Sequence, residues 1–246
     1  MKNLTLAIAL VISCFSLAQS ADEIIQKAED HMRGTSSYSE MTIETIRPKW
    51  TREMTIKTWT KGDDYSVTLV LSPAKDKGTV FLKRKNEIWQ YIPSIERTIK
   101  MPPSMLNQSW MGTDMTNDDL VRESSLKNDY NKKIVGTETI EGLACHKIVM
   151  TPKEDVNSIW GKLEIWVSKK DYLQLKTKFY DEDNVLVNTI LGKSVKTIGG
   201  KIIPTVMEVV PADKKGQKTR MEYTNAEFNL PIDDEIFTTQ YMKRLK

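Results

Sequence analysis

Residues 79–120 read TVFLKRKNEIWQYIPSIERTIKMPPSMLNQSWMGTDMTNDDL, and this stretch decides the fold. Its first part has the alternating apolar and aromatic residues of a β-hairpin, with a turn at Lys85-Asn86. Pro102-Pro103 ends that pattern, and the residues that follow are rich in Met and Trp. Thr116 precedes an acidic residue, Asp119, by three positions, which is the pattern of a helix N-terminal capping box. A β-surface followed by an irregular apolar segment favours a protein that covers an apolar ligand.

Alternation of apolar and polar residues extends on both sides of this stretch. It begins near Tyr38, continues to Leu71, and resumes after residue 130. Connections as short as those around Gly62 and Gly199-Gly200 join antiparallel strands, because a parallel crossover needs a dozen or more residues. The later strands are predicted at residues 132–139, 144–151, 159–168, 173–180, 185–196, 201–210 and 218–228.

One early helix is predicted over residues 22–33, with Asp22 as its cap and Gly34 at its end. Its apolar stripe consists of Ile24, Ile25, Ala28 and Met32. A helical turn is also expected at 233–237. No low-complexity linker divides residues 21–246, so one domain is expected. The predicted fold class is mainly β with a few helices. Its architecture would be a strongly curved antiparallel sheet, or half-open β-barrel, with helices forming a lid over its concave face.

Residues 1–20 have the features of a secretory signal peptide. Lys2 supplies a positive charge, residues 4–15 are almost wholly apolar, and Ala18-Gln19-Ser20 offers small residues for cleavage. The apolar run is shorter than the roughly 20 residues that span a bilayer. Alternatively, Cys14 ends a lipobox-like sequence and would carry a lipid anchor. Simple cleavage is favoured because the apolar run continues past Cys14. Both routes lead out of the cytoplasm, and a periplasmic location is expected.

Charge and chemistry exclude several classes of function. The net charge of +3 is spread along the chain, which is not the pattern of a nucleic-acid-binding surface. Cys145 is interpreted as a structural thiol in a strand, and His31 and His146 as surface or core residues. The chain contains no G-x-S-x-G, H-E-x-x-H, P-loop or CxxC motif. We therefore expect no enzyme activity, no cofactor and no metal.

A calcium site is the alternative for the acidic residues of the opening stretch. Asp114, Asp118 and Asp119 could supply carboxylates, but the glycine-turned loop of known calcium motifs is missing. Helix capping explains these residues better.

Met and Trp residues indicate what a hollow sheet could hold. Methionine adapts to varied apolar ligands because its side chain is flexible and polarisable. A curved sheet with few helices would leave an apolar trough, and an acyl chain in it would gain ~0.8 kcal/mol per buried methylene. The alternation alone assigns the strand residues of this set to the concave face, and a shift of one residue in register would turn them all outward. The residues expected to contact acyl chains are Ile25, Met32, Met54, Ile56, Val67, Leu69, Trp89, Tyr91, Leu106, Trp110, Met111 and Met115.

Four stretches resemble the LolA-type outer-membrane lipoprotein-sorting family, in its longer LolA-like branch. The most specific is WMGTDMTNDDL at 110–120, which is similar to the branch signature MGSDFTxxDL. The others are the first helix with TSSYS at 35–39, EIWQYIP at 87–93, and FNLP at 228–231 with Phe237. The chain departs from short LolA proteins after Trp59, where no arginine follows.

The resemblance implies a half-open barrel with a helical lid over a hydrophobic cavity. It also implies a periplasmic carrier of lipoprotein or lipid acyl chains, moved toward the outer membrane. An inner-membrane exporter is the implied donor, and the outer-membrane acceptor stays open. We expect a monomer with no nucleic-acid partner. The alternative is a periplasmic sensor or interaction domain of a transporter or envelope-stress system that carries no cargo. A hydrolase using His146 or Asp114 is the more distant third.

Overall fold

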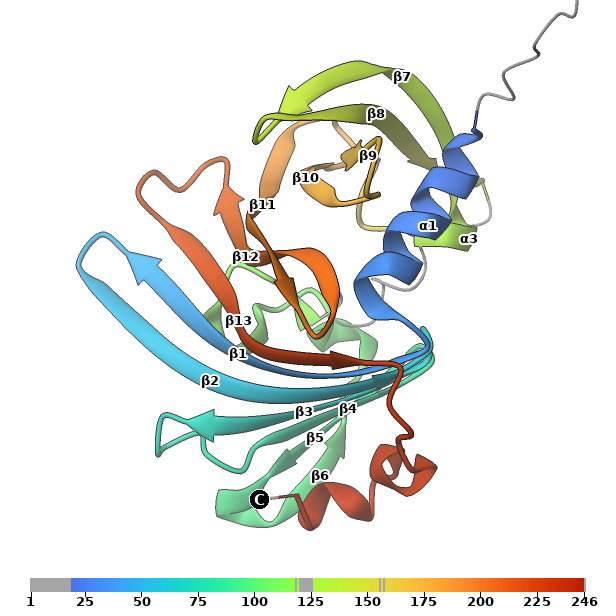
Figure 1. Cartoon of the computed structure of the whole chain (residues 1–246). Coiled ribbons are helices and arrows are strands. Elements are labelled where there is room, and N and C mark those ends of the chain that lie inside the picture. Colours follow the sequence, from blue (N-terminus) through green and yellow to red (C-terminus); the bar gives the residue numbers. More distant parts are fainter. Residues whose placement is uncertain (1–18, 118, 120–125, 155, 157, 246) are drawn as a thin grey trace, which may run out of the picture.

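Thirteen antiparallel strands form one open, curved sheet. The structure, a computed structural model, describes residues 19–117, 119, 126–154, 156 and 158–245. The strand order is β6-β5-β4-β3-β2-β1-β13-β12-β11-β10-β9-β8-β7. Figure 1 shows the sheet curling from β1–β3 through β11–β13 to β7–β9. The predicted mainly-β fold with a curved antiparallel sheet is therefore confirmed.

The strand bounds follow the alternation closely. The first six strands are β1 (Ser36–Arg47), β2 (Trp50–Lys61), β3 (Tyr65–Ser72), β4 (Val80–Arg84), β5 (Glu87–Ile92) and β6 (Arg97–Lys100). The others are β7 (Tyr130–Ile140), β8 (Leu143–Pro152), β9 (Lys162–Ser168), β10 (Gln174–Tyr180), β11 (Leu186–Ile198), β12 (Lys201–Pro211) and β13 (Lys218–Phe228). Consecutive strands pair with each other, except β6 and β7, which form the two edges of the sheet; in addition, β1 pairs with β13. This long-range pair joins the two halves of the sheet.

In the described part of the chain, the helices are few and short. They are α1 (Ala21–Arg33) and α3 (Leu126–Asp129), with 3-10 turns η1 (Pro93–Ile95), η2 (Pro103–Met105), η3 (Trp110–Gly112), η4 (Asp234–Phe237) and η5 (Tyr241–Lys243). In the part of the chain that the structure describes, no helix has the length and apolarity to cross a bilayer. Residues 1–18 of the predicted signal peptide, including Cys14, lie outside the described residues.

Helix α1 packs on the second half of the sheet (Figure 1). Its N-cap is Ser20 rather than the predicted Asp22, because Ser20 and Glu23 form a reciprocal capping box. Ser20 is thus outside the helix, and Asp22 lies in the first turn, where an acid favours the helix dipole. Three members of the predicted apolar stripe, Ile24, Ile25 and Ala28, pack against β7–β9. The buried members of this cluster are Ala21, Ile24, Ile25, Ala28, Tyr130, Ile148, Met150, Trp160, Leu163, Ile165 and Val167.

The C-terminal turns cover the outer, convex face of the first half of the sheet. Phe237 of η4 and Met242 of η5 are buried against strands β3 and β4. The ring centroids of Phe237 and Tyr65 lie 5.7 Å apart. The helical turn predicted at 233–237 is confirmed by η4. This second core gives β3–β5 apolar side chains on both faces, which decides where the candidate site residues lie.

Glu208 joins three strands on the convex face. Its carboxylate on β12 accepts hydrogen bonds from Lys193 Nζ of β11 at 2.9 Å and from Lys218 Nζ of β13 at 2.6 Å. Burial raises the pKa of the Glu208 carboxyl, but the two ammonium groups together lower it further, and the net pKa lies below its usual range. The ionised carboxylate therefore stabilises this part of the sheet.

We expect Glu208→Gln to remove a pH-dependent part of the stability. A carboxyl with a lowered pKa in the folded state stabilises the fold above its unfolded pKa, and the effect is lost as the pH falls through the folded pKa. Urea unfolding at pH 7 should show a loss of about 1–3 kcal/mol. The difference from the unsubstituted protein should shrink steadily as the pH falls below 4. A difference that stays constant over this range would contradict the assignment.

Candidate ligand-binding site

A cavity of about 340 Å³ lies on the concave side of the sheet. This volume falls within the range of about 300–1,000 Å³ that is typical of small-molecule sites. Most of the lining is apolar, and its members come from α1, six or more strands and the loop after β6. Its apolar lining includes Met41, Ile43, Ile56, Phe81, Met207 and Met221.

Residues 101–117, here called the flap, close one side of this cavity. Trp110 is 1% exposed and inserts into the apolar cluster on the concave face. Its ring packs edge-on against Phe81, with the centroids 5.6 Å apart. Trp110 and Met115 both line the cavity. Among the described residues, the buried Nε1 of Trp110 has no hydrogen-bond partner. The flap is therefore a wall of the cavity, anchored by one large side chain.

The flap also holds its own shape through hydrogen bonds. Trp110 N donates to Met115 O at 2.8 Å, and Thr113 Oγ1 donates to Trp110 O at 2.7 Å. Thr116 and Asp119 form the predicted capping box: Thr116 N donates to Asp119 Oδ2 at 2.7 Å, and Asp119 N donates to Thr116 Oγ1 at 3.1 Å. The capping prediction is thus confirmed for this pair. Asp118 lies outside the described residues.

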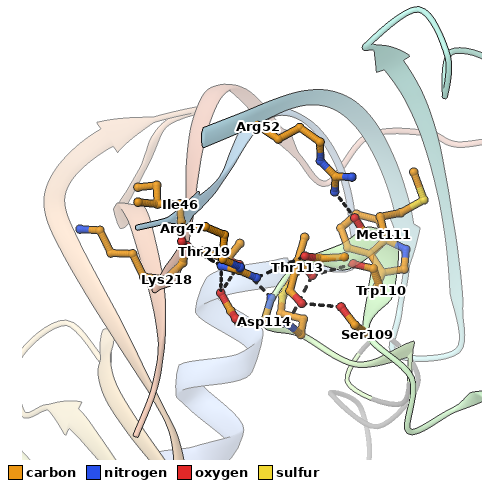
Figure 2. A network of polar contacts seen from close by, with 12 residues as sticks. Ile46, Arg47, Arg52, Ser109, Trp110, Met111, Thr113, Asp114, Lys218 and Thr219 are labelled. Atoms are coloured by element: carbon orange, nitrogen blue, oxygen red, sulfur yellow. Dashed lines mark hydrogen bonds and ion pairs between the residues drawn. The ribbon is translucent and has the colours of Figure 1, made fainter. Parts of the chain in front are cut away.

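Two arginines at the β1–β2 hairpin fasten the flap to the sheet (Figure 2). Arg47 Nη1 donates to Asp114 Oδ2 at 2.9 Å, and Thr219 Oγ1 of β13 donates to the same oxygen at 2.7 Å. Asp114 N in turn donates to Thr219 Oγ1 at 2.9 Å. Arg52 Nη2 donates to the backbone oxygen of Met111. We call Arg47, Asp114 and Thr219 the latch, because they join the flap to β1 and β13.

The predicted site residues separate into three groups. Met32, Ile56, Trp110 and Met115 line the cavity. Met54, Leu106 and Met111 belong to the same apolar cluster behind that lining, and Ile25 lies in the cluster under α1. The structure thus brings Leu106, Trp110, Met111 and Met115 of the flap together with Ile56 in one apolar cluster.

The third group lies on the opposite face, and its predicted placement was wrong. Val67, Leu69, Trp89 and Tyr91 pack in the convex cluster with Phe237 and Met242. The alternation predicts two faces but not which one is concave, and β3–β5 are apolar on both. The inner face of these strands instead presents Phe81, Lys83 and Ile88 to the cavity. The same alternation predicts these three residues on the concave face if the opposite set of alternate residues is assigned to it.

Cys145 and His146 do not line the cavity. Cys145 is buried, its Sγ contacts Leu143 O at 3.3 Å, and burial raises the pKa of its thiol. The pKa of His146 is lowered, first by burial and then by the charge of Lys169. In the described part of the chain, no group of three or more His, Cys, Asp or Glu residues could hold a metal ion. The cavity therefore offers mainly apolar contacts.

Three solved structures have a fold similar to that of this chain. A DUF1329 family protein from Desulfovibrio piger is 22% identical with a TM-score of 0.82, over 90% of this chain and 97% of that one. A putative outer membrane lipoprotein-sorting protein domain from Vibrio parahaemolyticus is 20% identical with a TM-score of 0.80, covering 91% and 98%. A LolA superfamily protein from Nitrosomonas europaea is 23% identical with a TM-score of 0.77, covering 91% and 100%.

The family itself is shown by a sequence model. A family model described as "uncharacterized protein" matches residues 62–244, so the chain belongs to that family. No curated protein matches the chain. The resemblance predicted from 110–120 and the other stretches is thus confirmed in the fold.

Proposed function

We propose that this protein is a periplasmic carrier that binds the acyl chains of lipoproteins or other lipids and moves them toward the outer membrane. The observation that carries the proposal is the mostly apolar cavity on the concave face, walled by the flap. The LolA-superfamily fold supports it, since one solved structure of this fold is described as a lipoprotein-sorting protein domain.

The lining suits a flexible apolar ligand. Met41, Met115, Met207 and Met221 surround the cavity, and methionine side chains adjust to chains of different length and branching. Each methylene that leaves water contributes ~0.8 kcal/mol. Burial alone therefore supplies the affinity, and the proposed function requires neither a catalytic residue nor a cofactor.

The proposed partners follow from a carrier cycle. An inner-membrane exporter would deliver the lipid and an outer-membrane acceptor would take it, while the carrier acts as a monomer. A sensor domain without cargo would be expected to fill its concave face with its own side chains. The hollow beneath Trp110 supports the carrier over this alternative.

A fluorescent acyl probe tests the proposal directly. We expect probe binding by the native protein and a loss of more than about tenfold in affinity for Met207→Glu, because the charge would lie in an apolar wall. Val210→Glu is the matched control, since Val210 lies on the same strand and alternation points it to the opposite face. Urea unfolding of both variants reports whether they fold. Absence of probe binding by the native protein, or equal binding by both variants, would contradict the proposal.

A further inference from the structure

Six hydroxyl side chains form a patch on the cavity wall, two from each of three neighbouring strands. Strand register places them in two adjacent rows. One row is Ser37 of β1, Thr60 of β2 and Ser66 of β3; the other is Ser39, Thr58 and Thr68. All six line the cavity. We call these residues the hydroxyl patch.

A cavity wall that contacts only acyl chains does not require these hydroxyl groups. Acyl chains form no hydrogen bonds, and polar groups that lose water without a new partner cost free energy. Farther along the same strands, the inner face carries Met41, Ile43 and Ile56. The wall therefore changes from apolar under the flap to hydroxyl-bearing where β1 begins, next to the end of α1. An amphiphile has the same division between tail and head.

The hydroxyls are already organised in pairs. Ser37 Oγ lies 2.6 Å from Thr60 Oγ1, and Thr58 Oγ1 lies 3.1 Å from Thr68 Oγ1. Each hydroxyl has one donor and two acceptor positions, so a pair that shares one hydrogen retains capacity for a ligand. Such groups match a ligand that both donates and accepts hydrogen bonds.

The charges around the cavity do not select a charged ligand. Lys83 is 6% exposed, and its Nζ donates to the backbone oxygen of Asp63 at 2.7 Å. The cationic and acidic side chains of the lining are equal in number: Arg33, Lys83 and Lys176 against Glu29, Asp63 and Asp119. A net anion or a net cation would meet like charges as well as opposite ones. An uncharged headgroup fits this balance.

We propose that the hydroxyl patch binds the uncharged, hydroxyl-bearing headgroup of an amphiphile, such as a glyceryl or sugar ester. The acyl chain then extends along β1–β3 toward the flap. This inference rests on the proposed carrier function, to which it adds the class of headgroup and the orientation of the ligand.

Two lauroyl esters that share one acyl chain test the headgroup preference. The measurement is displacement of the fluorescent acyl probe by 1-lauroylglycerol, which carries hydroxyls, and by methyl laurate, which carries none. Thr58→Val/Thr68→Val removes both members of one pair, so neither hydroxyl is left without its partner. Valine keeps the branched shape that suits a strand. Thr55→Val is the control, because Thr55 lies on the other face of β2 and pairs with Ser72 Oγ at 2.7 Å.

We expect the native protein to prefer 1-lauroylglycerol, and the double variant to lose about tenfold of that affinity. Its affinity for methyl laurate should stay within about twofold, and Thr55→Val should change neither value. Equal affinity of the native protein for the two esters, or an unchanged preference in the double variant, would overturn the inference and leave the carrier function standing. Binding of neither ester would contradict the carrier function itself. Tighter binding of lauric acid would show that a charged headgroup is preferred and would also overturn the inference.

Discussion

Trp110→Ala is expected to lower the free energy of unfolding by about 3–5 kcal/mol. Trp110 is the largest side chain of the flap, and its ring lies between the flap and Phe81 on the sheet. Truncation to Ala removes apolar surface that is buried in the folded protein and leaves a void. The backbone of the flap is held by its own hydrogen bonds, so it can fill this void only in part. Urea unfolding at pH 7 measures the loss.

Trp50→Ala is the matched control for this prediction. Trp50 is 52% exposed at the tip of the β1–β2 hairpin, and the guanidinium carbon of Arg47 lies 5.8 Å from its ring centroid. Its removal should cost no more than about 1 kcal/mol. The Trp110→Ala variant should also release the acyl probe faster, which stopped-flow fluorescence measures. Similar losses of stability for the two variants would contradict the role of Trp110 as the anchor of the flap.

Asp114→Ala is expected to cost about 3 kcal/mol. The Asp114 side chain is 3% exposed, and its carboxylate accepts from both Arg47 and Thr219. Without it, a guanidinium that is only 14% exposed loses its counter-charge. The expected cost is at the low end of the range for a broken buried pair, because Arg47 can still reach water.

Two further variants separate the latch from a general effect of charge. Asp234→Ala removes an acid from the exposed pair with Lys61, so its stability should change little. Adding Arg47→Met to Asp114→Ala should recover part of the loss, because the unpaired cation is removed as well. Additive losses in that double variant, or a stable Asp114→Ala variant, would contradict the latch.

Local sequence patterns predicted most of the fold. Alternation and turn residues placed the strands from β7 to β13 within a few residues, since short connections leave only antiparallel pairing. The Thr116–Asp119 box was also predictable, because both partners lie within one turn. These features depend on neighbours in the chain.

The parts that the sequence did not predict depend on distant residues. The pairing of β1 with β13 and the contact of Arg47 with Asp114 join segments that no local pattern links. Trp89 was predicted to face the cavity, because an aromatic residue in an alternating strand is apolar on whichever face it lies. Trp89 packs on the convex face because the C-terminal turns cover that face with Phe237 and Met242. The i, i+2 spacing of Ser37/Ser39 and Thr58/Thr60 indicates that each pair shares one face of its strand. Only the register between the strands shows that the two pairs lie side by side in the hydroxyl patch.

The central claim is that the cavity beneath the flap holds an acyl chain. Mass spectrometry of organic extracts from natively purified protein tests it most directly, with the Met207→Glu variant purified in parallel. We predict a co-purifying amphiphile in the native protein and its loss from the variant. An extract of the native protein that contains no lipid, together with no uptake of the acyl probe, would contradict the account.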